Sequence, residues 1–514
     1  MVGLLAYGAY VPYHRLQRAA IGGVLGSGGG SGTRSVASYD EDSTSMGVEA
    51  ARVAVSSLPD RSTVRSLHFA TATPAYLDKT NATAVHAALD LDRSALAVDA
   101  VGSVRSGVGA LLAAAGSREP ALAVLSDVRT GLPGGADESA GGDGAAAFVL
   151  GDGIDGAPVV VELLGSASAS VEALERWRIP GAVASRVWEE RFGEEVYVPL
   201  AAEVFGDACK QAGVTADEID DLVVAGLHSR AVGRIARSLG TRPDAAVDDL
   251  TGSIGNAGTA QPGIVLADAL DRADAGQTVA LVVVGDGVSV LLWRTTEALA
   301  HRRPQRSVAA QVAGGNDGLP YATFLSWRGM LDREPPRRPD PEHPYAPPSL
   351  RRVAWKFGFV ASRCVACGMR HLPPSRVCGR CHAADAMVPE PMADLPARIA
   401  TYTVDRLAST PSPPLLMVVC DYDGGGRFRC ELTDAAPEEA TIGGRVEMTF
   451  RKTVTAGGIH NYFWKARPIR SADGGVITEE PLAGSSISTE EPLAGSSIST
   501  EEPLAGSSIS TEEA

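Results

Sequence analysis

The first 294 residues alternate between short apolar runs, glycine-rich turns and longer stretches rich in alanine and leucine. Short apolar runs between turn residues predict buried strands, and the alanine-rich stretches predict helices. The predicted strands are 122–125, 145–150, 158–163, 221–226 and 278–284. The predicted helices are 45–57, 107–115, 198–212, 231–239 and 263–272. This order of elements predicts an α/β fold with a largely buried sheet.

The two halves of this region, 1–165 and 166–294, resemble each other. AVDAVGSVRSGVGALLAAA leads to the strand ALAVLSD and then to GDGAAAFVLGDG, while AVDDLTGSIGNAGTAQPGIVLADAL leads to TVALVVVGDGVSVLLW. Each half therefore contains a strand, a Gly-Ser elbow, a helix and two late strands. The pattern indicates duplication of one β-α-β unit. Convergence on a composition of alanine, glycine and valine is the alternative.

After residue 294 the composition changes twice. Residues 295–354 are rich in arginine and proline, which predicts a linker; its basic clusters would alternatively suit a ligand that carries phosphate. Residues 394–470 contain short alternating strands between glycine-rich turns, as in a five-stranded barrel of the OB type. Residues 471–514 carry EEPLAGSSIST three times in identical form, which predicts a disordered tail.

Length, charge and cysteine content restrict the class of protein. A chain of 514 residues is too long for one hydrophobic core, so several domains are expected. The net charge of −16, of which tail glutamates supply 8, argues against nucleic-acid or anionic-membrane partners. The N-terminal MVGLLAYGAYVPYHRL has no basic leader or cleavage pattern, and no apolar run is long enough to span a membrane. We therefore expect a cytoplasmic protein, with free thiols rather than disulfides.

Residues 355–393 contain a predicted zinc ribbon. SRCVACGMRHLPPSRVCGRCH places Cys364 and Cys367 in one Cys-x-x-Cys unit and Cys378 and Cys381 in a second. Two such units predict a tetrahedral zinc ion with four thiolate ligands. His371 and His382 are possible substitute ligands, and four free or redox-active thiols are the alternative. Four thiolates leave no open position on the ion, so its role is expected to be structural.

The ribbon and barrel together resemble a known family. CxxCGxxxxPP…CxxC before an OB-type barrel, over about residues 355–469, is similar to the acyl-CoA-associated proteins that pair with thiolases and hydroxymethylglutaryl-CoA synthases. The first 294 residues resemble such a partner, a thiolase-superfamily domain similar to hydroxymethylglutaryl-CoA synthase and to β-ketoacyl carrier-protein synthase III. The marks are SYDEDSTSMGVEAAR, VDAVGSVRSGVGAL, AGLHSRAVGRIARSLG and GSIGNAGTAQPG. The resemblance implies a duplicated thiolase-like fold, acyl-CoA as substrate, and acyltransferase activity in lipid metabolism.

Two catalytic groups of that superfamily are replaced here. The family places a nucleophilic cysteine at the first elbow, where a helix dipole and a histidine lower its pKa. The family pattern puts Ser103 at the alanine, Val104 at this cysteine and Gly107 at the glycine. The family's glutamate general base falls on Ala72 in FATATPAYLDKTNA. The resemblance therefore argues against an acyl-cysteine intermediate.

Two other groups of the superfamily are retained. His228 ends the strand DLVVAGLHSR where the family keeps its histidine, and Asn256 lies in the second elbow where the family keeps an asparagine. Together they are predicted to polarise a thioester carbonyl. The alternatives are that His228 caps the following helix and that Asn256 forms an ordinary turn.

Replacement groups for the missing cysteine and glutamate lie close by. Ser103 is the candidate nucleophile, with Ser106 as a second, if His228 lies within hydrogen-bond distance, although Gly-Ser is also ordinary turn chemistry. Tyr76 and Asp78 are candidate acid or base groups by analogy with thiolase-fold aldolases.

Three functions are compatible with these residues. The first is an acyl-CoA enzyme that makes or breaks a carbon–carbon bond next to a thioester. The second is a catalytically silent acyl-CoA scaffold for a condensing partner. The third is nucleic-acid binding through Arg451, Lys452, Trp464 and Lys465, which the acidic charge opposes. The fold also implies a homodimer, or pairing with a thiolase-family partner, with the OB modules touching the thiolase domains.

Overall fold

A computed structural model describes residues 2–334, 337, 341–471 and 475–478. The three repeats of the predicted tail lie outside these residues. None of the described helices combines the length and the apolar run that a membrane crossing requires.

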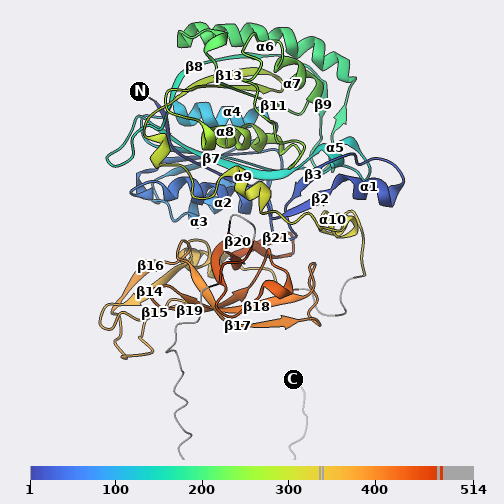
Figure 1. Cartoon of the computed structure of the whole chain (residues 1–514). Coiled ribbons are helices and arrows are strands. Elements are labelled where there is room, and N and C mark those ends of the chain that lie inside the picture. The colour runs from blue at the N-terminus through green and yellow to red at the C-terminus, as the bar shows by residue number, and fades with distance from the viewer. Residues whose placement is uncertain (1, 335–336, 338–340, 472–474, 479–514) are drawn as a thin grey trace, which may run out of the picture. The chain divides into compact units, whose positions relative to one another are not determined.

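The first domain is built on one nine-stranded mixed sheet (Figure 1). In spatial order its strands are β11 (Asp221–Gly226), β12 (Thr278–Val284), β13 (Gly287–Thr295), β8 (Val161–Ser170), β1 (Gly3–Tyr10), β7 (Asp143–Gly151), β6 (Ala121–Val128), β4 (Ser66–Thr71) and β5 (Leu96–Val101). The two halves of the sheet meet where β1 pairs with β8. The predicted α/β fold is confirmed.

Helices pack on the sheet in three groups. The helices are α2 (Ser43–Ser56), α3 (Ala82–Ala88), α4 (Arg105–Ala115), α6 (Glu190–Ala212), α7 (Ser229–Ile235) and α8 (Gln261–Arg272). α4 and α8 lie between the halves of the sheet, because α8 contacts β1 and β7 as well as β11 and β12 (Figure 1). α2 packs on β1, β6 and β7, and α6 packs on β8 and β13. Val108, Leu111 and Ile264 belong to the buried core between the halves.

The topology repeats from one half to the other. β5 runs parallel to β4 and leads through the first elbow to α4, and β6 then pairs antiparallel with β7. In the second half, Ala246 forms a parallel bridge to β11, the second elbow leads to α8, and β12 pairs antiparallel with β13. The predicted duplication is therefore present in the fold.

Shorter elements complete the first domain. They are β2 (His14–Gln17), α1 (Arg18–Leu25), β3 (Thr33–Val36), α5 (Ala136–Ala140), β9 (Arg176–Trp177), β10 (Arg186–Val187) and the 3-10 helices η1 (Arg61–Thr63), η2 (Ala216–Glu218), η3 (Gly258–Ala260) and η4 (Leu299–His301).

Part of segment 295–354, for which the sequence predicts a linker, packs on this domain. It contains α9 (Val308–Ala313), α10 (Tyr321–Trp327) and α11 (Ala346–Arg351), and α12 (Val353–Lys356) follows. α9 contacts β1 and α8. Tyr321 and Phe324 of α10 are buried in a small cluster with Leu16, Ile21 and Val36. These aromatic side chains attach the segment because their burial removes a large apolar area from water.

The ribbon and the barrel follow. The ribbon sheet has the order β15 (Arg370–His371), β14 (Val360–Cys364) and β16 (Met387–Pro391). The barrel sheet has the order β19 (Arg427–Glu431), β18 (Leu415–Tyr422), β17 (Ala397–Asp405), β20 (Arg445–Ala456) and β21 (Ile459–Pro468), with η5 (Pro437–Glu439). A bridge from Leu432 to Ala466 joins the two edges. This is the predicted five-stranded barrel, and its strand β20 contacts α2 of the first domain.

Candidate functional site

A cavity of about 490 Å³ lies where the first elbow, the end of β4 and the end of β12 meet. Its walls come from the loop after β4, the first elbow, the loop after β6, the segment around β9 and the ends of β11 and β12. The residues that carry the argument below are Ala72, Ser103, Val104, Arg129, Arg176, Arg178 and Leu227. Val104 and Ala72, which the sequence analysis predicts at the positions of the family's cysteine and glutamate, thus line one cavity.

The first elbow is held by its backbone. Gly102 has φ +131°, a conformation that favours glycine, and Val104 is the N-cap residue of α4. Ser106 Oγ accepts a hydrogen bond from the Ser103 N–H at 3.4 Å, so Ser106 closes the turn. Ser103 is half-buried and lines the cavity, whereas Val104 offers only methyl groups. The first elbow thus presents the Ser103 hydroxyl and the Val104 methyl groups at the start of α4.

His228 caps α7. Its Nδ1 accepts a hydrogen bond from the Ala231 N–H at 3.1 Å, which places the proton of the neutral imidazole on Nε2. The ring lies under the first turn of α6, because a Cβ at Gly193 would lie 2.6 Å from Nε2. Tyr197 of the same helix packs edge-on against the ring. The neighbouring Leu227 lines the cavity, and His228 itself is buried beside it.

Asn256 connects the second elbow to the end of β11. Its Nδ2 donates to the Gly226 carbonyl oxygen at 2.8 Å, and its Oδ1 accepts from the Gly258 N–H at 3.0 Å. These bonds fix the plane of the amide and leave its second N–H available, because an amide nitrogen carries two hydrogens. Gly226 lies two residues before His228. The hydrogen bond to Gly226 therefore connects Asn256 to the backbone segment that carries His228. Their catalytic roles stay predictions.

Asp127, at the end of β6, binds the backbone of the loop after β4, which lines the cavity. The sequence analysis did not identify this residue. Its Oδ1 accepts from the Ala72 N–H at 2.7 Å and its Oδ2 from the Thr259 N–H at 2.7 Å. Thr71 and Thr73 donate to it as well. The carboxylate is fully buried and joins the loop after β4 to the second elbow. An aspartate directly after an apolar strand was the only sequence signal for it.

Arginine side chains form much of the cavity wall, and they too escaped the sequence analysis. Arg178 donates to the Ala72 carbonyl oxygen. Arg176 Nη1 donates to both carboxylate oxygens of Asp137, at 2.9 and 3.0 Å. Arg129 follows β6 and is buried. The cavity wall therefore carries three arginines together with the acidic Glu175 and Asp286.

Tyr76 contacts the barrel. Its hydroxyl accepts a hydrogen bond from the His460 N–H at 2.8 Å, and the two rings lie 5.2 Å apart. Asp78 is exposed. This contact ties the loop after β4 to the hairpin between β20 and β21. A role for Tyr76 or Asp78 as acid or base stays a prediction.

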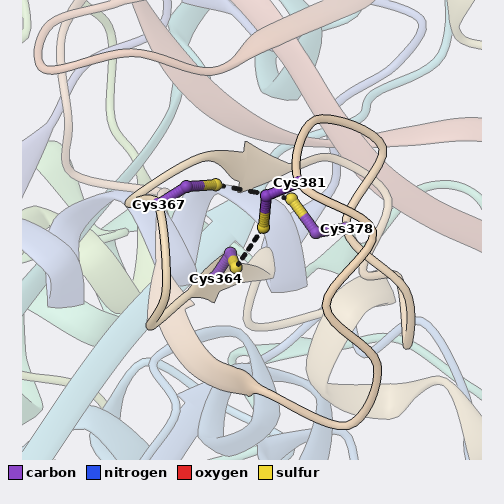
Figure 2. A group of neighbouring side chains, drawn as sticks. All are labelled: Cys364, Cys367, Cys378 and Cys381. Atoms are coloured by element: carbon purple, nitrogen blue, oxygen red, sulfur yellow. Dashed lines mark hydrogen bonds between the residues drawn. The ribbon is translucent and has the colours of Figure 1, made fainter.

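The four ribbon cysteines form a cluster that can hold a metal ion (Figure 2). Their sulfur atoms all lie within 4.8 Å of one another, with Cys364 and Cys381 3.7 Å apart and Cys367 and Cys378 3.5 Å apart. A tetrahedron with Zn–S bonds of about 2.3 Å has sulfur atoms about 3.8 Å apart. The side chains therefore fit an ion of this kind.

The two knuckles share one backbone geometry. The Gly368 N–H donates to the Cys364 carbonyl at 2.8 Å, and the His382 N–H donates to the Cys378 carbonyl at 3.0 Å. Gly368 and His382 both have positive φ. The N–H groups of Cys381 and Arg380 lower the pKa of Cys378 to about 5, which favours the thiolate that a metal requires.

Of the four residues that the nucleic-acid hypothesis names, only Lys452 is partly exposed, and the other three are buried. Arg451, Trp464 and Lys465 are at most 2% exposed. Arg451 pairs with Glu41 at 2.8 Å, and Lys465 pairs with Asp40 at 2.8 Å. These side chains hold the barrel to the first domain.

Comparison with known proteins agrees with both domains. Residues 209–293, which include His228 and Asn256, match the family described as 3-oxoacyl-[acyl-carrier-protein (ACP)] synthase III C terminal. Residues 390–451 match the family described as ChsH2, C-terminal OB-fold domain.

Several whole proteins are similar to the first domain. Hydroxymethylglutaryl-CoA synthase of Methanopyrus kandleri is 28% identical over 56% of this chain and 85% of its own length. The same enzyme of Pyrococcus furiosus is 29% identical over 56% of this chain and 83% of its own length.

The fold is also that of solved structures. MvaS in complex with 3-hydroxy-3-methylglutaryl coenzyme A has a TM-score of 0.53 at 19% identity over 66% of this chain and 94% of its own. Synthase III of Pseudomonas aeruginosa PAO1 has a TM-score of 0.51 at 21% identity over 58% of this chain and 98% of its own. The chain thus joins a thiolase-like domain, similar to hydroxymethylglutaryl-CoA synthases and to synthase III, to a four-cysteine ribbon and an OB-fold domain of the ChsH2 type.

Proposed function

We propose that this protein acts on an acyl-CoA thioester and makes or breaks a carbon–carbon bond next to the thioester without an acyl-cysteine. One observation carries the proposal: the cavity lies at the first elbow, and its wall contains Val104 and Ala72. The resemblance assigns these two residues to the positions of the nucleophile and the general base. The similarity to hydroxymethylglutaryl-CoA synthases and the solved complex with a CoA thioester support the substrate class.

In this mechanism the protein polarises the thioester carbonyl. We assign this role to the side chains of His228 and Asn256. Donors that are fixed before the reaction stabilise a developing enolate or oxyanion without reorganisation. The hydrogen bonds from Asn256 to Gly226 and from Ala231 to His228 supply this fixation.

Catalytically silent acyl-CoA binding is the second candidate. Neither His228 nor Asn256 belongs to the described cavity wall, and two family catalytic groups are replaced. Under this proposal the domain holds a thioester for a condensing partner.

Exchange of His228 separates the two candidates. His228→Asn keeps an N-cap acceptor for the Ala231 N–H, whereas His228→Ala removes both the cap and the imidazole. We expect His228→Ala to lower the free energy of unfolding by about 1 kcal/mol and His228→Asn to lower it by less. Turnover of acyl-CoA and β-hydroxyacyl-CoA thioesters should fall by about a hundredfold in both variants.

Product analysis and protein mass are followed together in this experiment. Turnover without a mass adduct supports the cysteine-free mechanism. An acyl adduct on Ser103 or Ser106 would identify a replacement nucleophile. Binding without turnover in the wild type would favour the silent scaffold.

We further propose that the ribbon holds zinc, in a structural role. Four thiolates saturate a tetrahedral ion and leave no position for substrate.

We also propose a homodimer through β5. This strand lies at one edge of the sheet, paired to β4 alone among the described strands, and Leu96 and Val101 on it are exposed. Multi-angle light scattering should give about twice the mass of one chain, and Leu96→Glu should give monomers, because a buried charge opposes pairing.

A further inference from the structure

Two carboxylates belong to the described wall of the cavity, and one of them is buried. Glu175 is 9% exposed, whereas Asp286 is open to solvent. Tyr76 and Asp78, the acid or base candidates of the sequence analysis, are not part of this wall. Glu175 is therefore the one buried acid that the described wall offers to a bound molecule.

Glu175 lies in the segment between β8 and α6, and two contacts fix this segment in the cavity wall. The Trp188 N–H donates to the Glu175 carbonyl oxygen at 2.7 Å, which closes the hairpin of β9 and β10. Arg178 of the same hairpin donates to the carbonyl oxygen of Ala72. The segment that carries Glu175 is thus tied to the residue that the resemblance places at the family's general base.

Tyr197 of α6 connects Glu175 to His228. Its hydroxyl donates to Glu175 Oε1 at 3.2 Å, and its ring packs edge-on against the imidazole, with the ring centres 6.3 Å apart. Burial and the charge of Glu175 raise the pKa of Tyr197, so the hydroxyl keeps the proton that it donates. In the described part of the chain this is the one hydrogen bond to the carboxylate. Glu175 Oε2 can therefore take a proton from a bound molecule.

We propose that Glu175 is the general base of this site, in place of the carboxylate that is missing at Ala72. The inference rests on the proposed function, because it requires a thioester in the cavity. A base must lie in the same cavity as the proton that it removes, and Glu175 shares its wall with Ser103 and Val104 of the first elbow.

The chemistry balances without a further reactant. In cleavage of a β-hydroxyacyl thioester, Glu175 takes the proton of the hydroxyl group while the bond between Cα and Cβ breaks. Cβ becomes a carbonyl carbon, and the electron pair of the broken bond forms an enolate on the thioester. The enolate carbon then takes the proton back from Glu175. The products are a shorter acyl thioester and an aldehyde or ketone.

Hydrogen exchange at the α carbon tests the base without the carbon–carbon step. The whole chain is incubated in deuterium oxide with a series of thioesters from acetyl-CoA to hexanoyl-CoA, and mass spectrometry follows deuterium in the acyl group. We expect wild type to exchange the α protons of at least one thioester. Glu175→Gln should lower this rate by about a hundredfold or more, because an amide cannot take the proton. The amide oxygen still accepts from Tyr197, so thioester affinity by titration calorimetry should stay unchanged.

Rescue by a small acid separates catalysis from a structural role. Glu175→Ala leaves space in the wall, and added acetate or formate should raise its exchange rate by about tenfold, because a small carboxylate can act from this space. A role limited to holding Tyr197 would give no recovery. Loss of exchange in both variants without rescue would therefore overturn the inference.

Two further variants are controls. Glu172→Gln changes an exposed carboxylate of the same segment that lies outside the described cavity wall, and it should exchange at the wild-type rate. Tyr197→Phe removes the hydrogen bond but keeps Glu175, so its exchange rate should fall by less than about tenfold.

The inference and the proposed function can fail separately. Wild-type exchange in Glu175→Gln would show that another group is the base, and it would leave the proposed function intact. If wild type neither exchanges nor cleaves any thioester, the proposed function fails together with this inference.

Discussion

Exchange of Cys378 for serine is expected to remove the metal from the ribbon and to unfold it. Cys378 is buried, and its sulfur accepts a hydrogen bond from the Arg380 N–H at 3.4 Å. Structural zinc contributes about 10–16 kcal/mol in small zinc domains, because the ligand geometry exists only in the folded state. Loss of one ligand should therefore outweigh what the short ribbon strands contribute. Chelation of the wild type should have the same effect.

Unfolding of the ribbon should also destabilise the barrel, but the first domain should stay folded. Arg370 of the ribbon donates to the carbonyl oxygens of Asp423 and Gly425, both at 2.9 Å. These contacts join the ribbon to the turn between β18 and β19. Metal content by mass spectrometry and limited proteolysis of residues 360–391 measure the effect.

A matched control is available among the remaining thiols. Cys209 is buried in α6, outside the four-cysteine cluster, and Cys209→Ser should keep about one zinc ion per chain. Retention of metal and of protease resistance in Cys378→Ser would contradict the prediction that Cys378 is a required metal ligand.

The elements with strong periodic patterns could be predicted from the sequence. The predicted strands 221–226 and 278–284 coincide with β11 and β12. Their consecutive valines and leucines are buried on both faces of the sheet, so the apolar run marks the whole strand. The ribbon was predictable for a similar reason, because the spacing of its ligands is local in the sequence.

Two elements differ most from the prediction, and each has a physical cause. β8 spans Val161–Ser170 rather than 158–163, because its Ser-Ala half lacks an apolar signal and is held by backbone pairing with β13. α6 begins at residue 190 rather than 198. Pro199 resembles the start of a helix in sequence but lies inside one, which tertiary packing tolerates here.

The cavity charges could not be predicted, because they depend on long-range contacts. The environment of Arg129 is set by Gly258 and Asp137, and no pattern in the sequence pairs these positions. The sequence analysis singled out Ala72 and Val104 only because the chain resembles a family that has catalytic groups at the corresponding positions. Their shared cavity is a property of the fold.

The barrel is held to the first domain by a buried ionic network centred on Arg451. This guanidinium lies 2.8 Å from Glu41, 3.3 Å from Asp40 and 2.5 Å from Asp434. Lys465 adds contacts to Asp40 at 2.8 Å. Burial alone would raise the pKa of Asp40, but Lys465 and Arg451 hold this pKa below its usual range. The contribution of Asp40 is thus present above about pH 4 and is lost as the pH falls through its folded pKa.

Arg451→Met is expected to lower the free energy of unfolding by about 3–5 kcal/mol. The methionine fills a similar volume, but it removes the guanidinium that pairs with Asp40, Glu41 and Asp434. Of these three buried residues, Asp40 keeps its ion pair with Lys465. The acid-induced loss of stability should also begin at higher pH than in wild type, because one of the two cations that lower the pKa of Asp40 is gone. Urea unfolding between pH 3 and 8 measures both effects.

Arg427→Met is the matched control within the same barrel. Arg427 pairs with Asp421 at 2.6 Å, but its side chain is 59% exposed. Water screens such a pair, so its loss should change the free energy of unfolding by less than about 1 kcal/mol. A similar change in both variants would mean that the buried network adds nothing beyond an exposed ion pair. A large change in Arg451→Met alone would show that the barrel and the first domain depend on these charges to stay together.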